Sequence, residues 1–133
     1  MVHTSASLAT QAVRVSIPAR ADLVHLLRTV TGSVCAHLAL SLDDIDDLRL
    51  AVDEACAELL SIPGDPRTIR LDLRPLPGRV EVVIGVDAPW PRQLPTDGLA
   101  WQVLGALADH VRFELWNGAP AIRIVKRTLG TIR

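Results

Sequence analysis

Residues Leu42–Leu60 read LDDIDDLRLAVDEACAELL, and this stretch decides the fold. Its apolar residues recur every three or four positions, which is the period of one face of an α-helix. Ser41 and Asp44 have the spacing of a capping box at its start, and Pro63 and Gly64 stop propagation after its end. The stretch therefore predicts a long amphipathic helix.

The helix face opposite the apolar stripe carries acidic residues. At about 100° per residue, Glu54 lies opposite the stripe, with Glu58 one turn later and Asp47 two turns earlier. A solvated acidic face is one interpretation of this line of carboxylates. A pocket wall or an interface is the other, because Leu50 and Ala57 place apolar side chains beside the acids. The sequence leaves both interpretations open.

Shorter periodic segments flank this helix. Helical spacing predicts two further helices, over residues 20–38 and 98–110. Alternating apolar residues predict five strands, over residues 11–17, 69–74, 79–86, 111–115 and 122–126. Asn117 and Gly118 predict a hairpin, and the prolines between 89 and 95 predict a loop. This order favours an α+β two-layer sandwich, with three helices on one face of a five-stranded mixed sheet.

Composition and charge limit the class of protein. A length of 133 residues favours one domain over residues 1–133, with residues 1–10 as a flexible terminus. A hydrophobic content of 49% with a net charge of -1 excludes a disordered chain. The same net charge gives no positive electrostatic potential that would attract nucleic acid. No apolar run reaches the roughly 20 residues of a membrane span, and the start lacks a signal-peptide pattern. We therefore expect a cytoplasmic protein with no nucleic-acid or membrane partner.

The thiol, imidazole and indole side chains form no metal or catalytic pattern. Cys35 and Cys56 lie in apolar helical stretches without CxxC spacing, so we expect buried, reduced thiols. The histidines never occur as HxxxH. Trp101 and Trp116 fit either core positions or anchors of an interface.

The long helix and its surroundings resemble the anti-sigma-factor serine/threonine kinases of the GHKL (Bergerat) ATPase superfamily. The resemblance rests on residues 42–60 and extends to DGLAWQVLGALAD, residues 97–109, and to the element order of nearly the whole chain. It implies a histidine kinase-like ATPase fold. Family members hold a sigma factor away from RNA polymerase and exchange it for an anti-anti-sigma protein of the STAS (sulfate-transporter-and-anti-sigma) type. The resemblance implies both partners here, and a homodimer.

The same resemblance implies a site for ATP and Mg²⁺ on the long helix. In the family motif Glu-Ala-x-x-Asn, the glutamate is the proposed base and the asparagine holds Mg²⁺. Glu54 stands at the glutamate position, which implies the catalytic base, and Glu58 replaces the asparagine as cofactor and metal ligand. A carboxylate oxygen can ligate Mg²⁺, although its charge repels the phosphates.

The glycine motifs of the family are altered in this chain. The motif Asp-x-Gly-x-Gly, whose aspartate reads the adenine amino group, corresponds to DAPWP at residues 87–91. Asp87 is therefore the adenine-reading candidate, and an ordinary turn aspartate is the alternative. Pro89 and Pro91 replace both glycines; proline fixes φ and removes an N–H donor.

The later Gly-x-Gly of the family, part of its phosphate lid, reads GLA at residues 98–100. One glycine is kept, so Gly98 and Ala100 are further cofactor-binding candidates. We expect Glu54 and Glu58 to line a cleft bounded by the loop 87–97.

The function implied is that of an anti-sigma-type regulator that sequesters a sigma factor, binds an anti-anti-sigma (STAS) protein, or both, with weak or absent use of ATP. An efficient phosphoryl transferase needs metal, phosphate cradle and base in register, and the altered motifs disturb two of these. The alternative is an active ATP-dependent serine kinase that phosphorylates the anti-anti-sigma partner. A third interpretation is an interaction module unrelated to transcription, because a fold does not fix a function.

Overall fold

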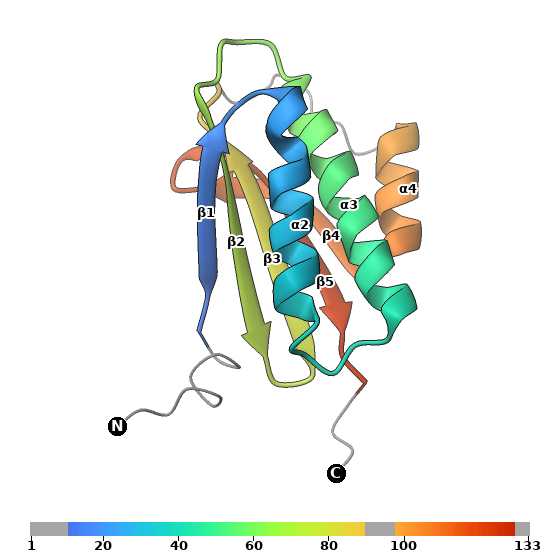
Figure 1. The fold of residues 1–133 in the computed structure, drawn as a ribbon. Coiled ribbons are helices and arrows are strands. Elements are labelled where there is room, and N and C mark those ends of the chain that lie inside the picture. Colours follow the sequence, from blue (N-terminus) through green and yellow to red (C-terminus); the bar gives the residue numbers. More distant parts are fainter. Residues whose placement is uncertain (1–10, 90–97, 130–133) are drawn as a thin grey trace, which may run out of the picture.

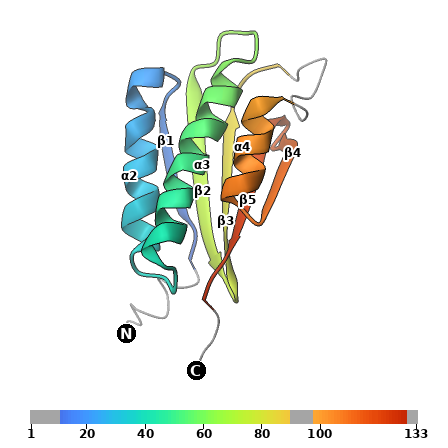
Figure 2. The same ribbon diagram turned by 90° about the vertical axis from the view of Figure 1, so that its right-hand side faces the viewer.

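The computed structural model describes residues 11–89 and 98–129, and the chain forms two layers (Figure 1). The predicted flexible terminus, 1–10, and most of the predicted proline loop, 90–97, lie outside the described residues. Three helices cover one face of a sheet and leave its other face open (Figure 2). In chain order the elements are β1 (Val13–Pro18), the 3-10 turn η1 (Ala21–Leu23), α2 (Val24–Cys35), α3 (Leu42–Leu60), β2 (Thr68–Leu76), β3 (Arg79–Val86), α4 (Leu99–Leu107), β4 (His110–Trp116) and β5 (Ala119–Arg127).

The sheet confirms the predicted five strands but is antiparallel throughout, so the prediction of a mixed sheet was wrong. Its strand order is β1-β2-β3-β5-β4, and every neighbouring pair is antiparallel. Strands β3 and β4, which flank α4 in the sequence, do run parallel to each other. However, β5 lies between them and pairs with both, so no parallel ladder forms.

Helix α3 spans the residues predicted for it and is held against the sheet by its apolar stripe. The Ser41 hydroxyl caps it by accepting a hydrogen bond from the Asp44 backbone N–H at 3.0 Å. The buried residues of the stripe are Leu48, Ala51, Val52, Ala55, Cys56 and Leu59. They share one core with the inward-facing residues of β2, β3 and β5. The packing of this stripe turns Glu54 and Glu58 away from the core.

Gly105 in α4 is a glycine that the fold does not require. It is exposed, and a Cβ added there would meet no atom within 4 Å. We expect Gly105→Ala to raise the free energy of unfolding by about 0.5–1 kcal/mol, since glycine weakens a helix interior by that amount. Urea denaturation measures the change. Gly85→Ala is the contrasting variant and should destabilise, because its Cβ would lie 2.9 Å from Cε3 of Trp116.

Candidate functional site

Glu54 and Glu58 lie four residues apart on α3, so their side chains are neighbours on one face of the helix. Both residues are half-buried. Among residues 11–89 and 98–129, neither carboxylate has a hydrogen-bond or ion-pair partner, so both can act as acceptors. The predicted cleft involves residues 90–97, which lie outside the described chain, and it stays a prediction.

The Asp87 side chain ties the end of β3 to the start of β2. Its Oδ1 accepts hydrogen bonds from the backbone N–H groups of Arg67 at 2.9 Å and Thr68 at 3.0 Å. These bonds, that from Thr68 most of all, hold the pKa of Asp87 below its ordinary value. Oδ1 therefore has a structural role, as in the alternative interpretation of Asp87 as an ordinary turn aspartate. Within the described chain Oδ2 has no such bond and is left to accept one.

Pro89 lies against the turn that follows α3. Gly64 in that turn has a φ of +139°, and a Cβ built on it would lie 2.8 Å from Cδ of Pro89. The proline that replaces the first family glycine is thus packed close to the chain beyond the C-terminal end of α3. This contact and the Asp87 bonds join the segment after β3 to the segment before β2.

We expect Gly64→Ala to lower the free energy of unfolding by about 1–2 kcal/mol, because a side chain there meets both an unfavourable φ and the Pro89 ring. Chemical denaturation measures the loss. Gly78→Ala is the matched control, since φ is +77° there but no atom lies within 4 Å of the added Cβ. If the two variants lose the same stability, the Pro89 contact contributes nothing.

Gly98 and Ala100 come together at the start of α4. Gly98 is the N-cap residue, and its carbonyl accepts hydrogen bonds from the backbone N–H groups of Trp101 and Gln102, both at 3.2 Å. Its φ is -91° and a Cβ there would meet no atom within 4 Å, so neither conformation nor space demands glycine. Ala100 is half-buried in the first turn. Helix α4 packs on α3, the helix of Glu54 and Glu58.

Metal-binding and thiol chemistry find little support in the part of the chain that the structure describes. There, no group of three or more His, Cys, Asp or Glu side chains is arranged to hold a metal ion. Cys35 and Cys56 are free and buried, as predicted, and desolvation raises the pKa of their thiols to about 11 and about 12. Both thiols are therefore protonated and unreactive at neutral pH.

No described helix is long and apolar enough to cross a membrane.

Comparison with known proteins assigns the fold. Residues 17–126 match the family model of the histidine kinase-like ATPase domain. The chain belongs to this family. The match spans all the helices of this ATPase-like domain and most of its sheet.

Relatives of this histidine kinase-like ATPase domain include proteins named for sigma-factor control. The chain is 34% identical over 102 residues to the anti-sigma-F factor RsbW of Mycobacterium tuberculosis, a match that covers 77% of this chain and 61% of that protein. It is 25% identical over 75 residues to the serine-protein kinase RsbW of Halalkalibacterium halodurans, covering 56% of this chain and 46% of the relative. The chain thus spans less than two thirds of the length of these relatives.

A solved structure has the same fold. The crystal structure of the RsbU and RsbW domains of a Mycobacterium tuberculosis protein superposes with a TM-score of 0.65 at 15% sequence identity. The superposition covers 90% of this chain and 33% of that chain. The predicted histidine kinase-like fold is confirmed.

A hollow between α2 and α3 of this ATPase-like domain escaped the sequence analysis. Its volume is about 390 Å³, and its walls include Arg28 and Asp53, whose Nη1 and Oδ2 atoms form an ion pair at 2.7 Å. The other carboxylate oxygen, Asp53 Oδ1, is buried without a hydrogen-bond partner. No local signal could have paired two residues that lie 25 positions apart. Leu26 and Leu50, on the same two helices, are exposed apolar side chains.

Proposed function

We propose that this histidine kinase-like ATPase domain is a regulator of transcription of the anti-sigma type. It sequesters a sigma factor, binds an anti-anti-sigma (STAS) protein, or both, in the cytoplasm, and it acts as a homodimer. The observation that carries the proposal is the 34% identity to an anti-sigma-F factor across 77% of this chain. The preserved two-layer fold supports it, because partner binding needs a preformed surface more than a tightly assembled catalytic pocket.

The proposal includes weak or absent use of ATP, because the residues present fit ATP and Mg²⁺ poorly. Glu58 brings a second negative charge to the place where the family has a neutral asparagine. Pro89 lacks the backbone N–H that a glycine would offer, and its ring packs on Gly64. One oxygen of Asp87 is already bonded to the backbone of β2 and its preceding turn. The chain therefore keeps acceptors for adenine and metal but loses the close backbone approach to phosphates.

The helix layer supplies the surface that we propose for the partner. The N-terminal half of α3 carries Asp43, Asp44, Asp46 and Asp47, which suit the steering of a basic partner. Beyond them lie exposed Leu50 and the hollow between α2 and α3. An apolar centre beside a charged rim is the usual anatomy of a protein interface.

A pull-down from the native cytoplasm, with and without Mg²⁺-ATP, tests the proposal. A sigma factor or a STAS protein should be recovered in both conditions. Leu50→Asp should reduce that recovery about tenfold, as expected for an apolar contact residue. Leu115→Asp is the matched control, because Leu50 and Leu115 are similarly exposed, at 55% and 57%, and Leu115 lies on β4. Recovery only with ATP would favour the serine kinase, and recovery of neither protein class would contradict the regulator.

Calorimetry with Mg²⁺-ATP tests the nucleotide part separately. We expect a dissociation constant weaker than about 1 mM for the natural chain. Glu58→Asn combined with Pro89→Gly should tighten binding about tenfold, because the pair of changes removes a phosphate-repelling charge and restores a backbone donor. Asp65→Asn, in the turn before β2, controls for the loss of one negative charge. A low-micromolar constant for the natural chain would contradict the proposal.

A further inference from the structure

One face of the sheet is turned away from the three helices (Figure 2). This open face is rich in arginine. Alternate residues of all five strands point to this face, and they form two groups of ion pairs and one contact between an arginine and a ring. Six arginines take part: Arg14, Arg70, Arg74, Arg79, Arg112 and Arg123. Within residues 11–89 and 98–129, three carboxylates take part: Asp72, Glu81 and Glu114.

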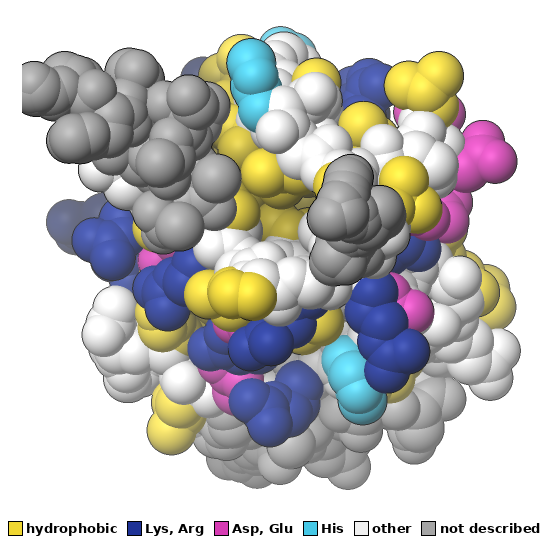
Figure 3. Space-filling view, turned by 90° about the horizontal axis from the view of Figure 1, so that it is seen from below, with side chains coloured by type: hydrophobic (Ala, Val, Ile, Leu, Met, Phe, Trp, Pro, Cys, Tyr) yellow, Lys and Arg dark blue, Asp and Glu magenta, His cyan; other side chains and the backbone are white. Residues whose placement is uncertain are grey.

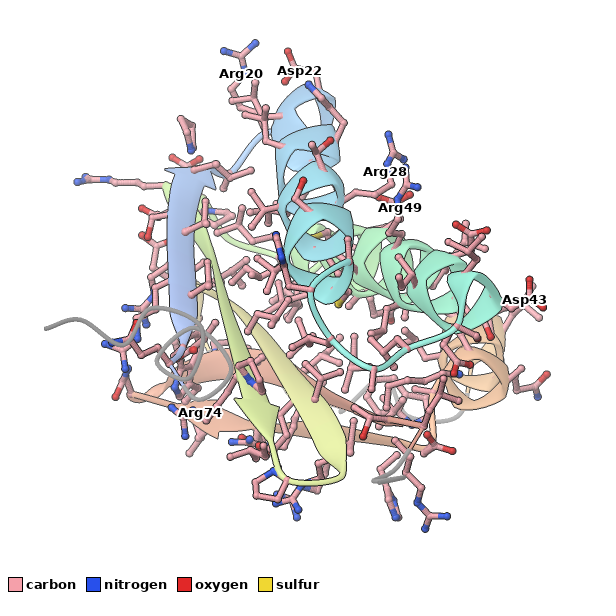
Figure 4. All side chains as sticks on the ribbon, turned by 60° about the horizontal axis from the view of Figure 1, so that its bottom comes forward. Arg20, Asp22, Arg28, Asp43, Arg49 and Arg74 are labelled. Carbon is pink, nitrogen blue, oxygen red and sulfur yellow. The ribbon has the colours of Figure 1, made fainter. Side chains whose placement is uncertain are left out.

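The carboxylates of the open face lie beneath the arginines. The side chains of Asp72, Glu81 and Glu114 are 6%, 15% and 18% exposed, whereas that of Arg14 is 73% exposed. A molecule approaching this face therefore meets guanidinium groups first. Seen from below, Lys and Arg side chains form a band across the middle and lower part of the view, with a smaller number of acidic side chains between them (Figure 3). Arg74 lies on the strand side, whereas Asp22 and Asp43 lie on the helix side (Figure 4).

Arg70 and Trp116 separate two hollows on the open face. The Trp116 ring lies over Gly85, and the guanidinium carbon of Arg70 lies 4.8 Å from the centroid of that ring. Both residues line both hollows. The hollow beside β1 has a volume of about 330 Å³ and also contacts Arg14, Asp72 and Arg74. The hollow at the end of β3 has a volume of about 380 Å³ and reaches Asp87.

The hollow beside β1 presents unused donors and one unused acceptor. Oδ2 of Asp72 lies 3.4 Å from Nε of Arg14 and 3.8 Å from Nη2 of Arg74, which is too long for strong hydrogen bonds. Within the described chain, the guanidinium groups of Arg14, Arg70 and Arg74 donate no hydrogen bond. Oδ1 of Asp72 is buried without a partner. The site therefore needs a ligand with several acceptors and at least one donor.

We propose that this open face binds an acidic peptide segment of a protein partner. Carboxylates of the segment pair with Arg14, Arg70 and Arg74, and a backbone N–H of the segment reaches Oδ1 of Asp72. A nucleic-acid backbone suits the site less well, because phosphates offer no donor to Asp72. A second copy of this chain would bring the same arginine-rich face, which is a like-charge contact. This surface goes beyond the proposed function, because it lies across the sheet from α3 and works without nucleotide.

An NMR titration of the full chain with a short peptide of alternating Glu and Ser tests the site directly. We expect shifts in the backbone signals of β1 and β2 and in the indole N–H of Trp116. The indole of Trp101 is the internal control, because its ring packs at 6.4 Å from that of Phe113 on the helix side. Equal shifts of the two indoles, or none, would contradict the site.

Charge reversal separates the site from general electrostatics. Arg14→Glu combined with Arg74→Glu should weaken the peptide affinity about tenfold, since exposed pairs each contribute a few-fold. Arg20→Glu combined with Arg49→Glu is the control, because it changes the net charge by the same amount on the helix side. It should change the peptide affinity by less than about twofold. Equal losses would overturn the proposal. Tighter binding of an oligothymidylate than of the peptide would overturn it too. A sedimentation coefficient of the Arg14→Glu, Arg74→Glu variant that differs from that of the natural chain would also overturn it, because it would indicate that a second copy of the chain binds to this face.

Discussion

Replacing Leu48 with alanine is expected to lower the free energy of unfolding by about 3 kcal/mol. Leu48 is fully buried in α3 and belongs to the core beneath the helix layer. Its truncation removes apolar contacts and leaves a cavity that rigid neighbours on the sheet fill only in part. Urea denaturation at neutral pH measures the loss. The helix that carries Glu54 and Glu58 therefore depends on this contact for its position.

Leu50→Ala is the matched control for this prediction. It removes the same atoms from the same helix two residues later, at an exposed position, and should change stability by less than about 0.5 kcal/mol. The same variant should nevertheless weaken partner recovery, because Leu50 lies on the surface proposed for the partner. Similar stability losses for the two variants would mean that α3 is not packed as described.

Replacing Arg123 with alanine is expected to cost about 2 kcal/mol at neutral pH. Its Nη1 donates to Glu81 Oε1 at 2.6 Å, and its Nη2 donates to Glu114 Oε2 at 2.8 Å, so it joins the neighbouring strands β3, β5 and β4 on the open face. Removing one partner from a partly buried ion pair leaves the remaining charge poorly solvated. The loss stays below that of a fully buried pair, because Arg79 and Arg112 still contact the two carboxylates.

The cost of Arg123→Ala should depend on pH. Burial raises the pKa of Glu114, but hydrogen bonds and charge from Arg123 outweigh it, so that pKa lies below its ordinary value. A lowered pKa means that the stabilisation is complete above the unfolded value, about 4.3, and is lost as pH falls through the folded value. The difference from the natural chain should therefore shrink at acid pH. Arg112→Ala, at an exposed position, should cost at most about 0.5 kcal/mol, and a pH-independent loss for Arg123→Ala would contradict this account.

The elements of the fold could be predicted because their signals are local. The bounds of α3 follow from a strong apolar period, the Ser41 cap and the Pro63 and Gly64 stop. The hairpin at Asn117 and Gly118 is confirmed, and both residues have positive φ, at 54° and 80°. The helix predicted over 20–38 is shorter, because Leu38 still packs against the core after the helix has ended at Cys35. The apolar periodicity reports which residues pack against the core, and such residues continue after the helix has ended.

The arrangement of the site could not be predicted, because its contacts join distant parts of the chain. The backbone donors to Asp87 come from residues 19 and 20 positions earlier. The bond from Arg123 to Glu81 spans 42 positions. Periodicity placed Trp101 and Trp116 only as core or interface residues; Trp101 packs against the core, and Trp116 lies on the open face. The roles of Glu54, Glu58, Gly98 and Ala100 in nucleotide binding stay predictions.

The strand order has a consequence for how the protein behaves when concentrated. Strands β1 and β4 are the outermost strands of the described sheet, and each has a paired strand on one side only. Unpaired strand borders let sheets of separate molecules join into ribbons. Charged Arg14 with Pro18 on β1, and Arg112 on β4, oppose such joining. Loss of Arg14 or Arg112 therefore lowers the concentration at which the protein begins to aggregate.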